Sequence, residues 1–245
     1  MKWSDRLYFG TWLLERQLKE PSVNKIEEIL LFALDSGIRR FDTAAVYGEG
    51  KIEEILGACL PEDAVIVTKI PAITKPYLQS PAPIQEFYSR NHMNRSVEGS
   101  LSRLRSTSVD TILLHNWLPS WSLNAIEILQ CLREMKEQGI ARRVGISLPD
   151  NFSSHVKQEV LLYIDVIEAP FNPEQRWVLE QLPTLIGLKK EVILRSLFGH
   201  GKLLTEYSSE SLAQDAFKLG TSVVIGMTTE EQITQNINCL KGEVK

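Results

Sequence analysis

Eight short apolar runs recur from one end of the sequence to the other, separated by longer segments that mix apolar and polar residues. Most of the runs lack polar alternation, which is typical of parallel strands covered on both faces. Because short apolar runs also occur in buried helices, the assignment depends on their length and on the residues that flank them. The predicted strands are Leu7–Trp12, Ile38–Asp42, Val65–Ile70, Thr111–His115, Arg143–Ser147, Val166–Pro170, Val192–Ser196 and Ser222–Gly226.

The segments between these runs show helical periodicity, with apolar residues three or four positions apart. Ile26, Ile29 and Ala33 fall on one face of the first such segment. Ser22 and Thr229 are suited to cap the helices that follow them, because their hydroxyls accept hydrogen bonds from backbone N–H groups. The predicted helices are Val23–Ser36, Lys51–Leu60, Asn94–Arg105, Leu123–Gln138, Glu174–Leu182, Ser208–Leu219 and Thr229–Leu240.

The alternation of strand and helix predicts an α/β fold with a parallel sheet and helical crossovers. Eight such units close most simply into a single-domain (β/α)8 TIM barrel that uses residues 1–245. A doubly wound open sheet is the alternative, but it needs Gly-x-Gly-x-x-Gly after the first strand, where only Gly10 stands. The length agrees with the barrel, since such barrels have about 250 residues.

Charge and composition exclude several classes of protein. The 27 Lys and Arg residues against 31 Asp and Glu give a net charge of −4, so a basic nucleic-acid-binding surface is not expected. The longest apolar run, Ile29–Leu34, is far shorter than the roughly 18 residues of a membrane helix. Met1–Asp5 has no apolar core and does not resemble a signal peptide.

The cysteines indicate a reducing compartment. Cys59, Cys131 and Cys239 are odd in number, far apart and without zinc-motif spacing. All three fall in predicted helices, where we expect them to be core thiols. Together with the charge and the hydropathy, this predicts a cytoplasmic protein without a bound metal and without nucleic-acid or membrane partners.

Ionisable residues stand at the C-terminal ends of three consecutive predicted strands. Asp42 ends the second strand, Lys69 nearly ends the third and His115 ends the fourth. Active sites of barrels lie at this end of the strands, and each of these residues has strongly apolar neighbours. A single ionisable residue of this kind could be a buried structural group. Three structural groups buried independently of one another would not be expected at equivalent ends of three consecutive strands.

Tyr47 follows Asp42 by five residues and completes a candidate proton-transfer site. A phenol has a pKa of about 10, and a nearby ammonium such as that of Lys69 lowers it. Asp42 would keep Lys69 charged and oriented, and His115 would donate a hydrogen bond to a substrate oxygen. These residues predict a site that moves a proton on and off a carbonyl or alcohol oxygen. The sequence shows neither a metal-ligand set nor a Ser-His-Asp order.

The segment GIRRFDTAAVYG at positions 37–48 resembles the aldo/keto reductase signature around its catalytic aspartate and tyrosine. The stretch 67–69 is similar to the strand with the catalytic lysine, and 100–115 to the stretch that ends in the catalytic histidine. Further resemblances follow in the same order and cover nearly the whole chain: residues 9–12, 138–147, 170–172, 196–204 over the cofactor pyrophosphate, and 224–226 with Gln232 and Asn236 at the adenosine end.

This resemblance implies a (β/α)8 barrel that reduces a small aldehyde or ketone reversibly with NAD(P)H. It implies that Tyr47 is the general acid, that Lys69 lowers the pKa of Tyr47, that Asp42 supports Lys69 and that His115 orients the carbonyl. The cofactor-binding residues that it implies are Gly10, Thr11, Trp12, Ser147, Glu168, Arg195, Ser196, Leu197, Gly199, Gly201, Gly226, Met227, Thr228, Gln232 and Asn236.

The sequence departs from the family pattern where the nicotinamide is expected. Leu148 stands where the family usually has asparagine, Glu168 where it has glutamine, and Arg195 where it has a stacking aromatic residue. Arg195 is predicted either to stack on the nicotinamide or to pair with Glu168. Because residues 227–229 include no lysine or arginine for a 2′-phosphate, NADP(H) and NAD(H) are both retained as cofactors.

These departures support an alternative function, a barrel that keeps the four catalytic residues but binds nicotinamide weakly or not at all. It would act as a non-redox proton-transfer enzyme or as a binding protein. The Pro-rich stretch Ile70–Tyr88 is expected on the active-site face, as a substrate loop or as a rigid surface loop. Trp117 and Trp121 are expected either to wall the pocket or to pack, and His200 either to touch phosphate or to lie exposed.

Two features of length suggest a barrel with open cofactor and substrate faces. Only about twenty residues separate Gly201 from the last predicted strand, which leaves little room for a long loop over the cofactor. The sequence also ends at Lys245, soon after its last predicted helix.

Overall fold

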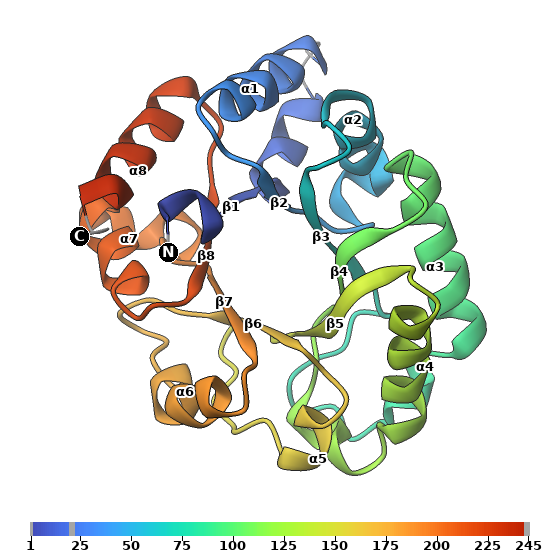
Figure 1. Ribbon diagram of the computed structural model, residues 1–245. Coiled ribbons are helices and arrows are strands. Elements are labelled where there is room, and N and C mark those ends of the chain that lie inside the picture. The colour runs from blue at the N-terminus through green and yellow to red at the C-terminus, as the bar shows by residue number, and fades with distance from the viewer. Residues whose placement is uncertain (1, 20–22, 243–245) are drawn as a thin grey trace.

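Eight parallel strands close into a barrel in the computed structural model, which describes residues 2–19 and 23–242. Each strand pairs with the next in sequence, and β8 pairs with β1 to complete the ring (Figure 1). The predicted (β/α)8 TIM barrel is therefore confirmed. The strands are β1 (Leu7–Gly10), β2 (Arg40–Asp42), β3 (Val65–Ile70), β4 (Val109–Leu114), β5 (Ala141–Ser147), β6 (Val166–Pro170), β7 (Glu191–Arg195) and β8 (Ser222–Gly226).

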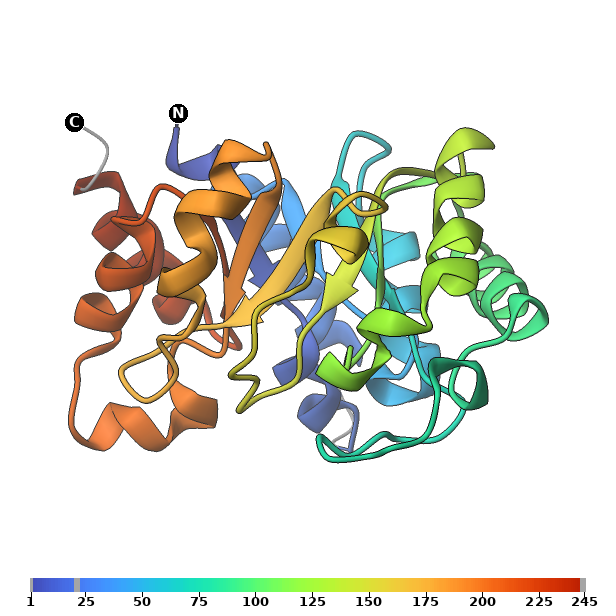
Figure 2. The ribbon, with the colours of Figure 1, turned by 90° about the horizontal axis from the view of Figure 1, so that it is seen from below.

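Helices surround the strands on the outside of the barrel (Figure 2). The α-helices are α1 (Val23–Asp35), α2 (Lys51–Cys59), α3 (Arg90–Arg103), α4 (Ile126–Glu137), α5 (Gln158–Leu161), α6 (Val178–Gly187), α7 (Ser209–Phe217) and α8 (Glu230–Gly242). Short 3-10 segments are η1 (Trp3–Asp5), η2 (Trp12–Lys19), η3 (Tyr47–Gly50), η4 (Ile84–Glu86), η5 (Pro119–Leu123) and η6 (Gly199–Thr205).

Sequence analysis predicted the strands more closely than the helices. Three strands, β3, β6 and β8, have the predicted bounds, whereas β1 ends before Trp12, which begins η2. The list of predicted helices lacked α5, because four residues are too few to show helical periodicity. Helix α6 begins four residues after the predicted start and continues past Pro183.

Side chains from every second position of the strands fill the barrel interior. Tyr8, Val67, Leu113, Val166 and Ile193 form a separate buried apolar cluster. Because side chains alternate between the two faces of a strand, the residues two positions further along β3, β4, β6 and β7 face the same interior. Those residues are Lys69, His115, Glu168 and Arg195. The same periodicity that packs the barrel therefore directs four charged or polar side chains to its C-terminal mouth.

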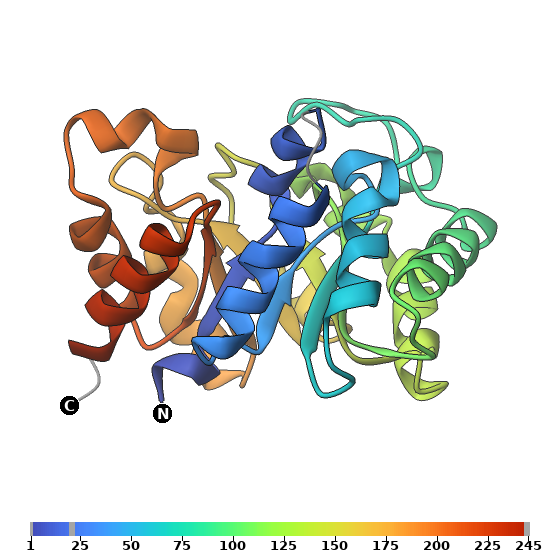
Figure 3. The same cartoon turned by 90° about the horizontal axis from the view of Figure 1, so that it is seen from above.

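The connections that follow the strands gather at one end of the molecule. Figure 3 shows η2, the stretch after β3 and η6 at this end, whereas η1 and the end of α8 lie at the other. The Pro-rich stretch Ile70–Tyr88 begins with the last residue of β3 and is otherwise irregular except for η4, as expected. This end is the one where the sequence predicts the active site.

Two helix caps were predicted from hydroxyl residues. The Thr229 hydroxyl accepts a hydrogen bond from the Gln232 backbone N–H at 3.2 Å, so its role as N-cap of α8 is confirmed. Ser22 lies outside the described residues. Over the described part of the chain, each helix is too short or too polar to cross a lipid bilayer.

Candidate active site

Lys69 and Asp42 form a buried ion pair at the C-terminal end of the barrel. The Lys69 ammonium donates to the two carboxylate oxygens of Asp42 at 2.7 and 2.6 Å and to the Thr43 carbonyl at 3.0 Å. Burial by itself lowers the pKa of a lysine, but Asp42 and Glu168 outweigh it and raise the pKa of Lys69 above its ordinary value. Lys69 is therefore a fixed positive charge within the site.

Tyr47 begins η3, in a turn that brings its ring next to this ion pair. The next three residues, 48–50, have φ angles of 57°, 55° and 89°, and two of them are glycines, which adopt such left-handed values without steric cost. The Lys69 nitrogen lies 5.7 Å from the centroid of the Tyr47 ring. The His115 ring lies edge-on to Tyr47, with 6.4 Å between the ring centroids. The predicted four residues are thus brought together.

Tyr47 holds its proton more firmly than the sequence predicts. Burial raises the pKa of Tyr47 to about 12, and Asp42 and Glu168 add to the rise, while Lys69 opposes it. Lys69 therefore acts in the predicted direction, but burial outweighs it, and the pKa of Tyr47 lies above the ordinary value of a phenol. The reason is that the phenolate would lose its solvation in this site.

His115 follows β4 directly and is held from both sides by its backbone. Its N–H donates to the Ile70 carbonyl at 3.0 Å, and its carbonyl accepts from the Tyr88 hydroxyl. Burial lowers the pKa of His115 to about 3, and the charge of Lys69 adds to the effect. The imidazole is therefore neutral at pH 7 and carries one N–H donor.

Glu168 on β6 lies between the cations of Lys69 and Arg195. Its Oε1 is 3.2 Å from Arg195 Nε and accepts from the Ser147 hydroxyl at 2.9 Å, while its Oε2 is 3.4 Å from Lys69 Nζ. Of the two alternatives for Arg195, the ion pair with Glu168 is present in the structure. Stacking on a nicotinamide ring stays a prediction.

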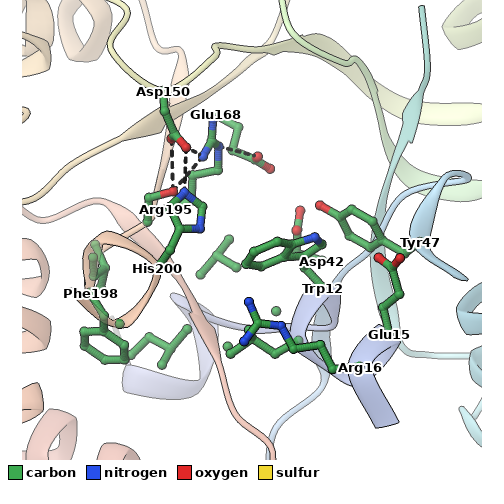
Figure 4. Close-up of a pocket in the computed structure, with 18 of the residues that line it drawn as sticks. Trp12, Glu15, Arg16, Asp42, Tyr47, Asp150, Glu168, Arg195, Phe198 and His200 are labelled. Carbon is green, nitrogen blue, oxygen red and sulfur yellow. Dashed lines mark hydrogen bonds and ion pairs between the residues drawn. The ribbon is translucent and has the colours of Figure 1, made fainter. Parts of the chain in front are cut away.

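Asp150, in the loop after β5, is a functional candidate that the sequence analysis missed. Its carboxylate contacts Arg195 Nη1 and His200 Nε2, each at 2.7 Å (Figure 4). The His200 ring in turn meets the Trp12 ring edge-on at 5.2 Å, so the loops after β1, β5 and β7 are joined. A signal was present, since Asp150 is a carboxylate just beyond a strand end.

A cavity of ≈1150 Å³ runs across this end of the barrel from Tyr47 and His115 to α8. Sites for drug-sized ligands have about 300–1,000 Å³, so this cavity has room for a dinucleotide together with a small substrate. The predicted site residues that line it are Gly10, Trp12, Asp42, Tyr47, His115, Glu168, Arg195, Ser196, Leu197, Gly201, Gly226, Gln232 and Asn236. Thr11, Lys69, Ser147, Gly199, Met227 and Thr228 are predicted site residues that do not line it.

Several further residues line the cavity although the sequence did not single them out. Glu15 and Arg16 project from η2, and Lys75 comes from the Pro-rich stretch. Tyr207 and Glu210 lie between η6 and the first turn of α7. These side chains come from loops and short helices that have no strand register, so sequence periodicity could not place them at the cavity.

The model of the aldo/keto reductase family matches residues 6–218 of this chain. The chain belongs to the aldo/keto reductase family. Aldo-keto reductase YhdN of Bacillus subtilis is 28% identical to it over 221 residues, which cover 84% of this chain and 63% of YhdN. The chain thus spans less than two thirds of the length of that relative.

Solved structures of other aldo-keto reductases share the fold. The holo form of AKR11C1 from Bacillus halodurans has a TM-score of 0.74 and 21% identity, covering 96% of this chain and 86% of that one. An aldo-keto reductase from Klebsiella pneumoniae, solved in complex with NADPH, has a TM-score of 0.73 and 22% identity, covering 96% and 85%.

The cavity of this family member has polar groups at both of its ends. Gln232 and Asn236 border it at one end, and Tyr47 and His115 at the other. Between them, Gly201 has a φ of 91°, and a Cβ built on it would meet no atom within 4 Å, so the loop after β7 leaves open space there. Below the end bordered by Tyr47 and His115, the Ser147 hydroxyl donates to Glu168.

The other candidates from the sequence in this aldo/keto reductase are packed tryptophans and cysteines and one exposed histidine. Trp117 and Trp121 are fully buried and pack edge-on, with 5.9 Å between their ring centroids. Of the two predicted alternatives, packing is therefore confirmed, and the prediction that they wall the pocket is wrong. Cys131 is buried, whereas Cys59 and Cys239 are only partly buried. His200 is exposed, as one alternative predicts. Among the described residues there is no group of three His, Cys, Asp or Glu side chains placed to hold a metal ion.

Proposed function

We propose that this protein catalyses the reversible, NAD(P)H-dependent reduction of a small aldehyde or ketone to an alcohol, with Tyr47 as the general acid. The observation that carries the proposal is the buried Lys69–Asp42 ion pair next to the Tyr47 ring, opposite a neutral His115. These groups stand at one end of a cavity with room for a dinucleotide. Family membership supports the same chemistry.

In this proposal the chain's own residues handle the proton and orient the carbonyl. His115 donates a hydrogen bond to the carbonyl oxygen, since its neutral imidazole has one N–H to give. Tyr47 donates its proton to the same oxygen as negative charge develops there. Lys69, kept charged by Asp42, stabilises the phenolate that remains. A bound nicotinamide would supply the hydride.

The cofactor would lie along the cavity between η2 and the loops after β7 and β8. Gln232 and Asn236 would contact its adenosine end, the stretch 196–201 its pyrophosphate and Arg195 its nicotinamide. NADP(H) and NAD(H) both remain proposed, because the stretch 226–229 offers hydroxyl groups and the N-terminus of α8 rather than a cation.

Substitution of Tyr47 by phenylalanine tests the proposal. We expect Tyr47→Phe to lose at least about a hundredfold in kcat for NADPH- or NADH-dependent reduction of 4-nitrobenzaldehyde, because general acid catalysis is worth this much or more. The matched control is Tyr8→Phe, which removes a hydroxyl inside the barrel near Arg40 and Arg143, below the apolar layer. Turnover at the wild-type rate in Tyr47→Phe would refute the proposed role.

One observation favours a second candidate, a non-redox proton-transfer enzyme or a binding protein. The side chains at the expected carboxamide position are engaged with one another, because Ser147 donates to Glu168 and Arg195 pairs with it. Leu148, which stands in place of an amide, is fully buried. A direct test of nicotinamide binding separates this candidate from the reductase.

A further inference from the structure

Glu168 is an unusual residue at its position because it is a fully buried carboxylate between two cations. It adds a second carboxyl group to that of Asp42 inside the barrel mouth. The side chain has no exposed surface, and its two oxygens contact Arg195, Ser147 and Lys69 at 3.2, 2.9 and 3.4 Å. A buried charge is stable only with such partners.

The charged groups around Glu168 come from every strand and loop that packs against it. Two cations, Lys69 and Arg195, face two interior carboxyls, Asp42 and Glu168. A neutral glutamine at 168 would leave Lys69 with Asp42 and Arg195 with Asp150 as their carboxylate partners. The titratable and charged groups that face this cluster are Asp42 from β2, Tyr47 from η3, Lys69 from β3, His115 after β4, Asp150 after β5, Arg195 from β7 and His200 from η6.

The two carboxyls beside Lys69, Asp42 and Glu168, influence each other's ionisation. Burial opposes the ionisation of Glu168, but Lys69 and Arg195 hold its pKa below the ordinary value. Burial raises the pKa of Asp42 well above its ordinary range, Glu168 adds to the rise, and Lys69 opposes it. The contacts of the two carboxyls differ, since Glu168 lies 3.2 Å from Arg195 and 3.4 Å from Lys69, whereas Asp42 accepts two hydrogen bonds from Lys69.

We propose that Glu168 is a positioning residue that anchors Lys69 as a second carboxylate, with Arg195 as its counter-ion, and that this ion pair tunes proton donation by Tyr47. The inference rests on the proposed function, in which Tyr47 is the acid. Glu168 acts through Lys69 and through its own charge, without a contact to the reacting oxygen. The negative charge of Glu168 favours the protonated form of Tyr47, whereas the positive charge of Arg195 favours its phenolate form.

Single and double substitutions separate this role from a purely structural one. Glu168→Gln removes a negative charge, so the pH midpoint of Tyr47 should fall by about one unit. Arg195→Gln removes a positive charge, so the midpoint should rise by a similar amount. If the two charges act independently, the shifts in the double variant should cancel to within about half a unit. Any departure from the sum of the single shifts measures the coupling between Glu168 and Arg195.

The primary measurement is the pH dependence of kcat/KM for reduction of 4-nitrobenzaldehyde, which reports the acid of the free enzyme. Because Tyr47 must be protonated, activity should fall as pH rises through the midpoint, and it should fall at lower pH in Glu168→Gln. Glu168→Asp, which keeps the charge, should stay near the wild-type midpoint. If Glu168→Gln folds poorly, the comparison of Glu168→Asp with Arg195→Gln still tests the predicted direction.

The matched control is Glu53→Gln. Glu53 on α2 is also fully buried and ion-paired, at 2.7 Å to Arg103, but it lies outside the barrel wall. Glu53→Gln should reduce thermal stability and leave the pH midpoint where it is. The inference would be overturned if the pH midpoint moved equally in Glu53→Gln and Glu168→Gln, or if it did not move in Glu168→Gln.

A second measurement does not need turnover. Tyrosinate absorbance, read immediately after mixing into alkaline buffer and corrected with the corresponding Tyr47→Phe protein, gives the midpoint of Tyr47 directly. Opposite shifts in Glu168→Gln and Arg195→Gln support the inference even if no carbonyl is reduced, in which case only the proposed function fails. Equal midpoints in wild type and both variants refute the inference while leaving reductase activity to be judged by its own test.

Discussion

At the scale of single residues, the proton of Tyr47 is held by a balance of opposing charges. Burial favours the phenol, the two carboxyls of Asp42 and Glu168 reinforce it, and Lys69 and Arg195 favour the phenolate. A substrate oxygen that accumulates negative charge between Tyr47 and His115 would take the proton from this balance. The geometry thus suits an acid that releases its proton only to a bound acceptor.

His115 should make folding stability depend on pH. Its pKa is about 3 in the folded protein, against about 6.5 when unfolded. Between these values the unfolded chain binds a proton that the folded chain does not, so stability is present above pH 6.5 and is lost as pH falls. Relative to His115→Gln, the wild type should lose up to about 3 kcal/mol more between pH 7 and pH 4.

Urea denaturation of both proteins at the two pH values measures this difference. Subtracting the variant's loss of unfolding free energy from that of the wild type cancels the contribution of the carboxylates, because these groups titrate alike in both proteins. Parallel losses of unfolding free energy in wild type and variant would show that His115 binds its proton equally in the folded and unfolded states.

Residue types at strand ends made the candidate catalytic centre predictable from the sequence, whereas the loop contacts around it could not be predicted. Asp42, Lys69 and His115 follow from strand register, because inward positions repeat every second residue. Asp150 belongs to a loop with no such period, and its partners Arg195 and His200 are distant in sequence. The rise in the pKa of Tyr47 depends on burial, which the sequence alone does not quantify.

At the scale of elements, caps and turns position the residues that strands do not carry. The glycines in 48–50 allow the sharp turn after Tyr47, and the Thr229 cap starts α8, which carries Gln232 and Asn236 to the cavity. These features could be predicted because a hydroxyl before a helix and glycine in a turn have local causes. The short α5 could not, since its four residues depend on tertiary packing.

Removal of the α8 cap should lower stability modestly. Thr229→Ala leaves the Gln232 N–H without its acceptor at 3.2 Å, and the loss should be about 1 kcal/mol of unfolding free energy. Thr229→Asp, which restores an acceptor, is the matched variant and should unfold near the wild-type denaturant midpoint. Equal midpoints for Thr229→Ala and wild type would mean that this bond contributes nothing.

At the scale of the whole molecule, the barrel separates a polar mouth from a polar base by an apolar layer. At the base, Tyr8 interacts with Arg143 and Glu191; at the mouth, Lys69 interacts with Asp42 and Glu168. The register of eight strands made this architecture predictable from sequence, because eight strand–helix units can close only when every strand keeps the same direction. The predicted openness of the cofactor and substrate faces stays a prediction.

Cofactor binding tests the central claim most directly. Trp12 lines the cavity from η2, so bound NADPH or NADH should change the tryptophan fluorescence of the protein. We predict that titration of the purified protein with each nucleotide gives a saturable change in the micromolar range for at least one of them. Absence of any change with both nucleotides, confirmed by calorimetry, would contradict the account and favour the non-redox alternative.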